Sequence, residues 1–155
     1  SETTFRTYEE IFDIIILKNN NLVNRKEPKY QQRYNWTKEQ EKEFVDRYYM
    51  RISKESGLMS GFKAVYSLLR DNANIELFVI TARGLTLPEM KDDAQRVLDE
   101  NNIIFDKYFW SVKDKVDICK KEKIDLMIDD DWRIIEAMAK NNIKSLYFRD
   151  TNLRK

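Results

Sequence analysis

The strongest constraint on this chain is a regular alternation of short apolar runs and helical segments, which begins near residue 57. Four apolar runs read as β-strands, at 75–80, 107–110, 124–128 and 144–148. Helices are predicted before and between them, at 60–72, 88–101, 112–122 and 132–141. Strands that alternate with helices in this way favour right-handed crossovers and a parallel sheet covered on both faces. We therefore expect an α/β fold.

The first 56 residues follow a different, mostly helical pattern. Thr37 and Gln40 form a candidate capping box in front of a helix predicted at 38–54. A second helix is predicted at 8–19, although residues 11–17 also suit a short buried strand, and periodicity alone does not choose between them. We expect two regions, a helical cap region at 1–56 and an α/β core at 57–155.

The composition excludes several kinds of chemistry. The 155 residues include no histidine, which removes the commonest general base, the serine-histidine-aspartate triad and every histidine-containing metal site. Cys119 is the only cysteine, so neither an intrachain disulfide nor a cysteine-cluster metal site can form. Any chemistry must therefore use carboxylates, lysines, hydroxyls or a hard metal ion.

Charge and hydropathy bear on partners and location. The chain has 28 basic and 27 acidic residues, a net charge of +1, which offers no electrostatic footprint for nucleic acid or an anionic membrane. The apolar run at 14–17 is much shorter than the roughly 20 residues of a membrane span, and its acidic flank is unlike a secretory signal. We expect a cytoplasmic protein without a membrane or nucleic-acid partner, and the oligomeric state is left open.

Polar residues that end apolar strands are the candidate site residues, because ligands of parallel sheets bind at the carboxyl ends of the strands. Three carboxylates follow the strand at 124–128, namely Asp129, Asp130 and Asp131. Their mutual repulsion is relieved by a hard divalent ion, and Mg²⁺ suits one or two carboxylates together with a substrate phosphate. Asp131 is alternatively the N-cap of the helix that follows.

A threonine and a lysine complete the candidate set. Thr81 ends the strand at 75–80, where its hydroxyl and the next amides can face an anion. Lys115 lies in the first turn of the helix predicted after a Ser111 cap. The order along the chain is Thr81, then Lys115, then Asp129, and this order matters more than any one of them.

Three segments in this order resemble motifs two, three and four of the haloacid dehalogenase superfamily, and most of all its 5'-nucleotidase-like phosphatases. They are FVITAR at 78–83, KDKVDICK at 113–120 and IDLMIDD at 124–130. The resemblance covers residues 56–150 and implies a Rossmann-like parallel sheet flanked by helices, with residues 1–55 placed as an inserted helical cap.

The resemblance also implies roles for the individual residues. Thr81, with Ala82 and Arg83, binds the phosphoryl oxygens, and Lys115 neutralises the phosphate and the nucleophile. Asp129 and Asp130 hold Mg²⁺. Lys113 is an alternative to Lys115, because both lysines flank Asp114. The implied activity is hydrolysis of a small phosphorylated substrate, such as a nucleotide, through an aspartyl-phosphate.

One family motif is absent from residues 1–155. The first motif is an apolar strand that ends in Asp-x-Asp and carries the nucleophile, and no such sequence occurs here. We expect it upstream of residue 1. Because that strand is the central one, its absence should expose apolar faces on its neighbours. The alternative is a non-catalytic protein of the same fold that binds a metal, a phosphorylated ligand or a partner without turnover.

Aromatic residues in the cap region suggest how a leaving group is selected. Arg33, Tyr34 and Trp36 lie in the position where the family's cap contacts the substrate. A ring there can stack on a nucleobase, and an arginine can meet a phosphate. The alternative is that these aromatic rings pack the cap against the core.

Overall fold

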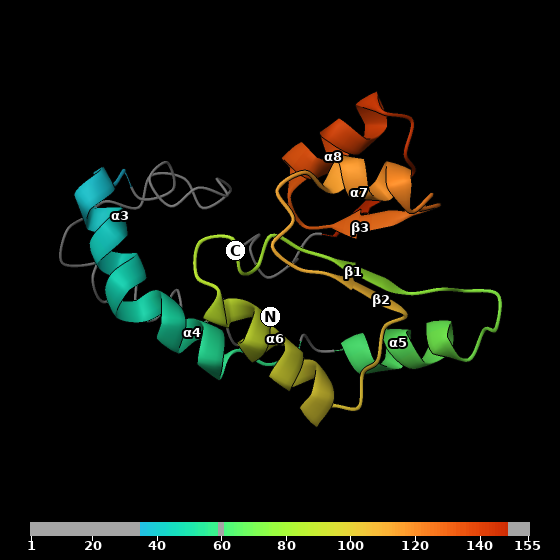
Figure 1. Cartoon of the computed structure of the whole chain (residues 1–155), viewed down its shortest axis with the longest axis horizontal. Coiled ribbons are helices and arrows are strands. Elements are labelled where there is room, and N and C mark those ends of the chain that lie inside the picture. Colours follow the sequence, from blue (N-terminus) through green and yellow to red (C-terminus); the bar gives the residue numbers. More distant parts are fainter. Residues whose placement is uncertain (1–34, 59–60, 149–155) are drawn as a thin grey trace.

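The structure is a computed structural model that describes residues 35–58 and 61–148. Its element order is mixed α/β, as the alternating pattern predicted (Figure 1). The strands are short: β1 (Phe78–Ile80), β2 (Lys107–Phe109), β3 (Met127–Asp129) and β4 (Ser145–Tyr147). The helices of the same region are α5 (Phe62–Arg70), α6 (Glu89–Glu100), α7 (Lys115–Lys121) and α8 (Trp132–Lys140).

The helix predicted at 38–54 is present as three consecutive segments, α3 (Lys38–Phe44), the π-helical η1 (Val45–Tyr49) and α4 (Met50–Glu55). Its capping box is confirmed. The Thr37 hydroxyl accepts from the Gln40 amide at 3.2 Å, and the Gln40 side chain accepts from the Thr37 amide at 2.9 Å. The helix predicted at 8–19 lies outside the described residues.

The described strands form two parallel pairs and not the single sheet that we expected. β1 pairs with β2 so that Phe78 faces Lys107, and β3 pairs with β4 so that Met127 faces Ser145. In the part of the chain that the structure describes, β1 and β3 therefore each have one edge without a strand partner. α5 and α6 lie beside the first pair, whereas α7 and α8 lie beside the second (Figure 1).

The main apolar core lies between the second strand pair and its helices. Its buried members are Cys119, Met127 and Met138. Ile80, at the end of β1, packs against the same cluster and joins the two strand pairs. A second cluster, around Phe44 and Ile52, lies in the α3–α4 helix and is joined to α6 by the buried Ser53, whose hydroxyl donates to Asp93 at 3.2 Å.

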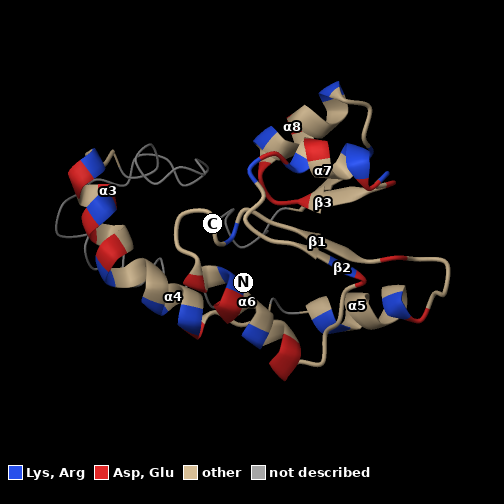
Figure 2. Ribbon diagram, viewed as in Figure 1, with Lys and Arg blue, Asp and Glu red and all other residues tan. Residues whose placement is uncertain are grey.

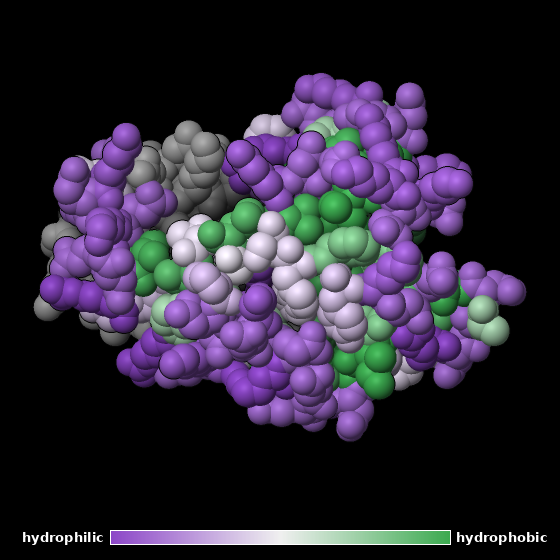
Figure 3. Space-filling model, viewed as in Figure 1, coloured by the Kyte–Doolittle hydropathy of each residue, from purple (hydrophilic) through white to green (hydrophobic). Residues whose placement is uncertain are grey.

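One face of the second strand pair carries exposed apolar side chains, and no described helix lies over it. Along β3 the burial alternates, so Met127 and Asp129 are buried while Ile128 is 53% exposed. The exposed apolar residues of this face are Leu126, Ile128, Leu146 and Phe148. Figure 3 shows hydrophobic residues at the surface in the region of the strands. Parallel sheets normally have both faces covered, so this face is unusual.

Three helices end in the same way, which sequence reasoning did not predict. α6, α7 and α8 are each followed by a residue with positive φ: Asn102, Lys123 and Asn142. The next residue in each case is an isoleucine whose amide donates to a carbonyl five residues earlier at 2.9, 2.9 and 3.0 Å: Ile103 to Leu98, Ile124 to Cys119, and Ile143 to Met138. This is the Schellman geometry, which stops a helix and turns the chain toward the next strand.

Candidate functional site

The centre of the candidate site is an ion pair between Lys115 and Asp129. The Lys115 Nζ lies 2.5 Å from Asp129 Oδ2. The Lys115 side chain is 17% exposed and that of Asp129 is 4% exposed, so the pair is shielded from water. A buried carboxylate requires such a partner, because an unpaired buried charge is strongly unfavourable. Residues 14 positions apart along the chain therefore meet at the end of β3.

Local structure explains why these two residues meet. Asp114 is the N-cap of α7 and accepts from the Asp117 amide at 3.1 Å, so Lys115 is the first residue of the helix. Asp129 is the last residue of β3, and its carbonyl accepts from the Phe148 amide at 2.8 Å. Its Oδ1 accepts from the Asp131 amide at 2.9 Å. Both carboxylate oxygens of Asp129 are thus occupied.

The other two carboxylates of the run differ from each other. Asp131 caps α8, as the sequence suggested: its side chain accepts from the Arg133 amide at 3.0 Å and forms an ion pair with the Arg133 guanidinium. The guanidinium lowers the pKa of Asp131. The pKa of Asp130 is raised, first because the protein around its carboxyl reduces hydration and then because Asp129 is negative. Figure 2 shows this acidic run directly after β3.

Thr81 lies at the end of β1 and is held by the strand ladder. Its amide donates to the Phe109 carbonyl at 3.0 Å, and its carbonyl accepts from the Val112 amide at 2.9 Å. The Thr81 hydroxyl accepts from the Arg83 amide at 3.2 Å. That hydroxyl keeps its own proton for another acceptor, because the bond to Arg83 uses only an oxygen lone pair.

The loops after β1 and β2 are fastened together. The Ser111 amide donates to the Arg83 carbonyl at 2.9 Å, and Ser111 has φ of 55°. Gly84 has φ of +96°, and a Cβ at this position would lie 2.6 Å from the Ser111 Oγ. The predicted Ser111 helix cap is therefore wrong: the residue belongs to this loop contact, and α7 begins later, with Asp114 as its cap.

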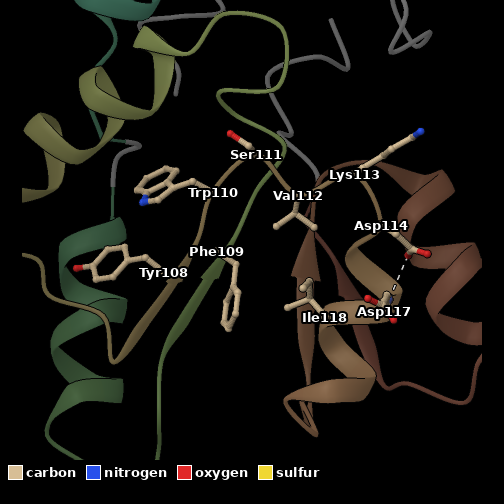
Figure 4. Close-up of a pocket in the computed structure, with 9 residues that line it drawn as sticks. All are labelled: Tyr108, Phe109, Trp110, Ser111, Val112, Lys113, Asp114, Asp117 and Ile118. Carbon is tan, nitrogen blue, oxygen red and sulfur yellow. Dashed lines mark hydrogen bonds between the residues drawn. The ribbon is translucent and has the colours of Figure 1, made fainter.

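Lys113 and Lys115 occupy different environments. Lys113 is exposed and points away from the neighbouring side chains in Figure 4, whereas Lys115 contacts Asp129. The structure thus places Lys115 beside the candidate metal ligand. Thr81 and Lys115 are linked through the loop before α7. The Val112 amide donates to the Thr81 carbonyl at 2.9 Å, and Val112 is three residues before Lys115 in the chain.

A hollow of about 440 Å³ lies at the loop that follows β2. It is lined by the end of β2, the following loop and α7, including Trp110, Ser111 and Lys113 (Figure 4). Thr81, Lys115 and Asp129 are not among the residues that line it. Trp110 was not predicted as a site residue, although its place at the end of an apolar strand was a usable signal.

Two further predictions concern a metal ion and the cap. Within residues 35–58 and 61–148, no group of three or more aspartate, glutamate or cysteine residues is arranged to hold a metal ion. Arg33 and Tyr34 lie outside the described residues. Trp36 packs on Phe44, with ring centroids 5.5 Å apart, so it belongs to the apolar cluster of the α3–α4 helix. This contact lies within the cap region and does not join it to the core.

Cys119 is a free, buried cysteine. It is buried and lies in the core under β3, and this burial raises the pKa of its thiol. Its contribution is to packing.

None of the described helices is long and apolar enough to cross a membrane.

The class that fold and site define is an α/β protein with a shielded lysine–aspartate pair at the carboxyl end of a parallel strand. When the chain was compared with protein-family models, curated proteins and solved structures, none of them matched it. The resemblance to the haloacid dehalogenase superfamily therefore rests on the three motifs and their order.

Proposed function

We propose that this chain provides the phosphate-binding and Mg²⁺-binding part of a haloacid dehalogenase-type phosphomonoester hydrolase. The nucleophilic aspartate is expected on a strand upstream of residue 1, and the reaction would pass through an aspartyl-phosphate. A cytoplasmic location and a small phosphorylated substrate, such as a nucleotide, belong to the same proposal. The observation that carries it is the shielded pair of Lys115 and Asp129 at the end of β3.

Each residue has a defined task in this reaction. The Thr81 hydroxyl, with its free proton, donates to a phosphoryl oxygen, and the amides of Ala82 and Arg83 follow it at the same strand end. Lys115 supplies positive charge close to the reacting group, and it is already held in place by Asp129. Such preorganised charge accounts for most of the rate enhancement in phosphoryl transfer.

The acidic residues fit a divalent cation in part. Asp129 and Asp130 offer the hard oxygen ligands that Mg²⁺ takes, and burial together with the neighbouring Asp129 raises the pKa of Asp130, an effect that a bound cation would oppose. When bound, Mg²⁺ would neutralise charge on the transferring phosphoryl group. A further carboxylate is expected from the Asp-x-Asp motif, because the described residues hold no group of three suitable ligands.

The proposed upstream strand would lie between the two strand pairs. Within the described residues each of the four strands has one unpaired edge, and Ile80 of β1 packs against the core beneath β3. A parallel strand between them would join the pairs into one sheet. Its carboxyl end would then lie between Thr81 and Asp129, where the nucleophile is required.

The test compares residues 1–155 with a chain extended upstream to include an Asp-x-Asp strand. The assay is Mg²⁺-dependent phosphate release from an aryl phosphate and from nucleoside monophosphates. We expect activity in the extended chain alone, and its loss in Lys115→Ala but not in the matched variant Lys113→Ala. A folded extended chain that binds Mg²⁺ but releases no phosphate would contradict the proposal.

A non-catalytic role is the second candidate, and one observation favours it. Lys115 and the Asp131 amide each bond one oxygen of Asp129, so the charge of this carboxylate is already balanced without a metal ion. Calorimetric titration with Mg²⁺ distinguishes the candidates at the level of binding. If Asp129→Asn with Asp130→Asn leaves the Mg²⁺ affinity unchanged, the assigned metal site is wrong.

A further inference from the structure

A column of aromatic side chains in contact, of which only the last pair is stacked, runs from α5 along β2 toward the carboxyl end of the sheet. Tyr66 packs on Phe105, with ring centroids 6.2 Å apart, and Phe105 packs on Tyr108 at 5.9 Å. Tyr108 in turn stacks on Trp110, at 6.1 Å and an interplanar angle of 19°. The Tyr108 hydroxyl accepts from the Phe105 amide at 2.9 Å. Trp110 is therefore the outermost ring of a column that is fixed at its base.

The strand register places Trp110 beside Thr81. Val79 faces Tyr108 and Ile80 faces Phe109, which is the last pair, and Thr81 and Trp110 are the next residues along the two strands. The Thr81 amide donates to the Phe109 carbonyl at 3.0 Å, so the backbone of Thr81 lies next to the residue that precedes Trp110. Paired residues of parallel strands point to the same face of the sheet.

Trp110 also adjoins a hollow at the end of β2. It is half-buried and is among the residues that line the hollow of about 440 Å³, and its ring points, with that of Tyr108, to the side of β2 away from Phe109 and Val112 (Figure 4). In the cap region, Trp36 packs on Phe44. A flat apolar ring next to a phosphate-binding hydroxyl is suited to an aromatic group attached to that phosphate.

We propose that Trp110 determines leaving-group specificity, and that it favours phosphate monoesters whose leaving group carries an aromatic ring. The inference rests on the proposed function, since it requires the phosphoryl group to bind at Thr81. Trp110 takes no part in bond making or breaking. It packs on the leaving group and so makes the binding of an aryl ester tighter than that of an alkyl ester.

The test measures binding, so that it does not depend on turnover. Phenyl phosphate and methyl phosphate are titrated by calorimetry with Mg²⁺ into the full chain, into Trp110→Leu and into the matched control Trp132→Leu, which replaces an exposed tryptophan of α8. We expect the wild type to prefer phenyl phosphate about tenfold. Trp110→Leu should remove this preference and leave methyl phosphate affinity within about twofold, whereas Trp132→Leu should retain it.

The outcomes separate the two proposals. Equal wild-type affinity for the two esters overturns the role of Trp110 and leaves the phosphate site standing. Binding of neither ester overturns both. If Trp110→Leu unfolds, Trp110→Phe keeps an aromatic ring and must retain at least half of the preference on a logarithmic scale; a complete loss of preference there would also overturn the inference.

Discussion

The two strand pairs use charge in opposite ways. The β1–β2 pair carries its ion pair at the amino end, where Asp106 and Arg70 are about one-third exposed and 2.9 Å apart. Its carboxyl end is held by backbone hydrogen bonds around Thr81 and Ser111. The β3–β4 pair instead shields Lys115 and Asp129 at its carboxyl end. The carboxyl end of one pair thus presents neutral hydrogen-bonding groups and that of the other a shielded ion pair, and the proposed phosphate site would use both.

The largest effect is expected from breaking the shielded pair. Lys115→Ala leaves the Asp129 carboxylate buried and unpaired, which should reduce the free energy of unfolding by about 3 kcal/mol. Lys113→Ala, at an exposed position, should change it by less than about 0.5 kcal/mol. Urea denaturation measures both. Lys115→Met with Asp129→Asn removes both charges and should recover most of the loss; equal effects of the two alanine variants would contradict the comparison.

The backbone-held end is tested at Gly84. Gly84→Ala places a Cβ 2.6 Å from the Ser111 Oγ and at φ of +96°, so we expect a loss of about 2 kcal/mol, measured by thermal unfolding. Adding Ser111→Ala removes the clash but not the unfavourable φ, and so should recover about half of the loss. If the double variant is no more stable than Gly84→Ala, the contact with Ser111 is not what limits this position.

A smaller effect is expected at the cap of α8. Asp131→Ala removes the acceptor of the Arg133 amide together with the ion pair to Arg133, which should cost about 1 kcal/mol in urea denaturation. Asp131→Asn keeps a capping oxygen without the charge and should cost about half as much. The opposite ranking of the two variants would mean that the charge matters more than the cap.

The smallest effect is a pH dependence at the exposed pair. The Leu77 amide, and then the Arg70 guanidinium, hold the pKa of Asp106 below its usual value of 3.8. The stabilisation is therefore present above about pH 4 and is lost as the pH falls through the lowered pKa of the folded state. In thermal melts from pH 6 to pH 2, the difference between the wild type and Asp106→Asn should shrink. A constant difference would exclude this carboxylate as the cause.

Sequence patterns predicted the helices better than the strands. The capping box at Thr37, the Asp131 cap and the place of Lys115 in the first turn of its helix are all confirmed, because each depends on residues within one turn. The strand predicted at 75–80 is shorter in the structure, where β1 begins at Phe78. Pairing with β2 sets this limit, and pairing is not a local property.

The candidate site was predicted in part. The end positions of Thr81 and Asp129 follow from the apolar runs before them, but the choice of Lys115 over Lys113 required the direction in which α7 leaves its Asp114 cap. The role of Ser111 was misjudged because its left-handed backbone is set by the loop contact with Arg83 and Gly84. Trp110 was not predicted, although its place at the end of the apolar run 107–110 was visible in the sequence, because only the pairing of β1 with β2 brings it near Thr81.

By itself the sequence determined the α/β class, the absence of histidine chemistry and the order of threonine, lysine and aspartates, since these depend on composition and on periods of a few residues. The tertiary structure decided which strands pair, which apolar face stays uncovered and which lysine meets the buried carboxylate. The physical reason is that burial and pairing depend on residues distant in the chain. The Lys115–Asp129 pair is shielded from water only because such distant residues pack around it.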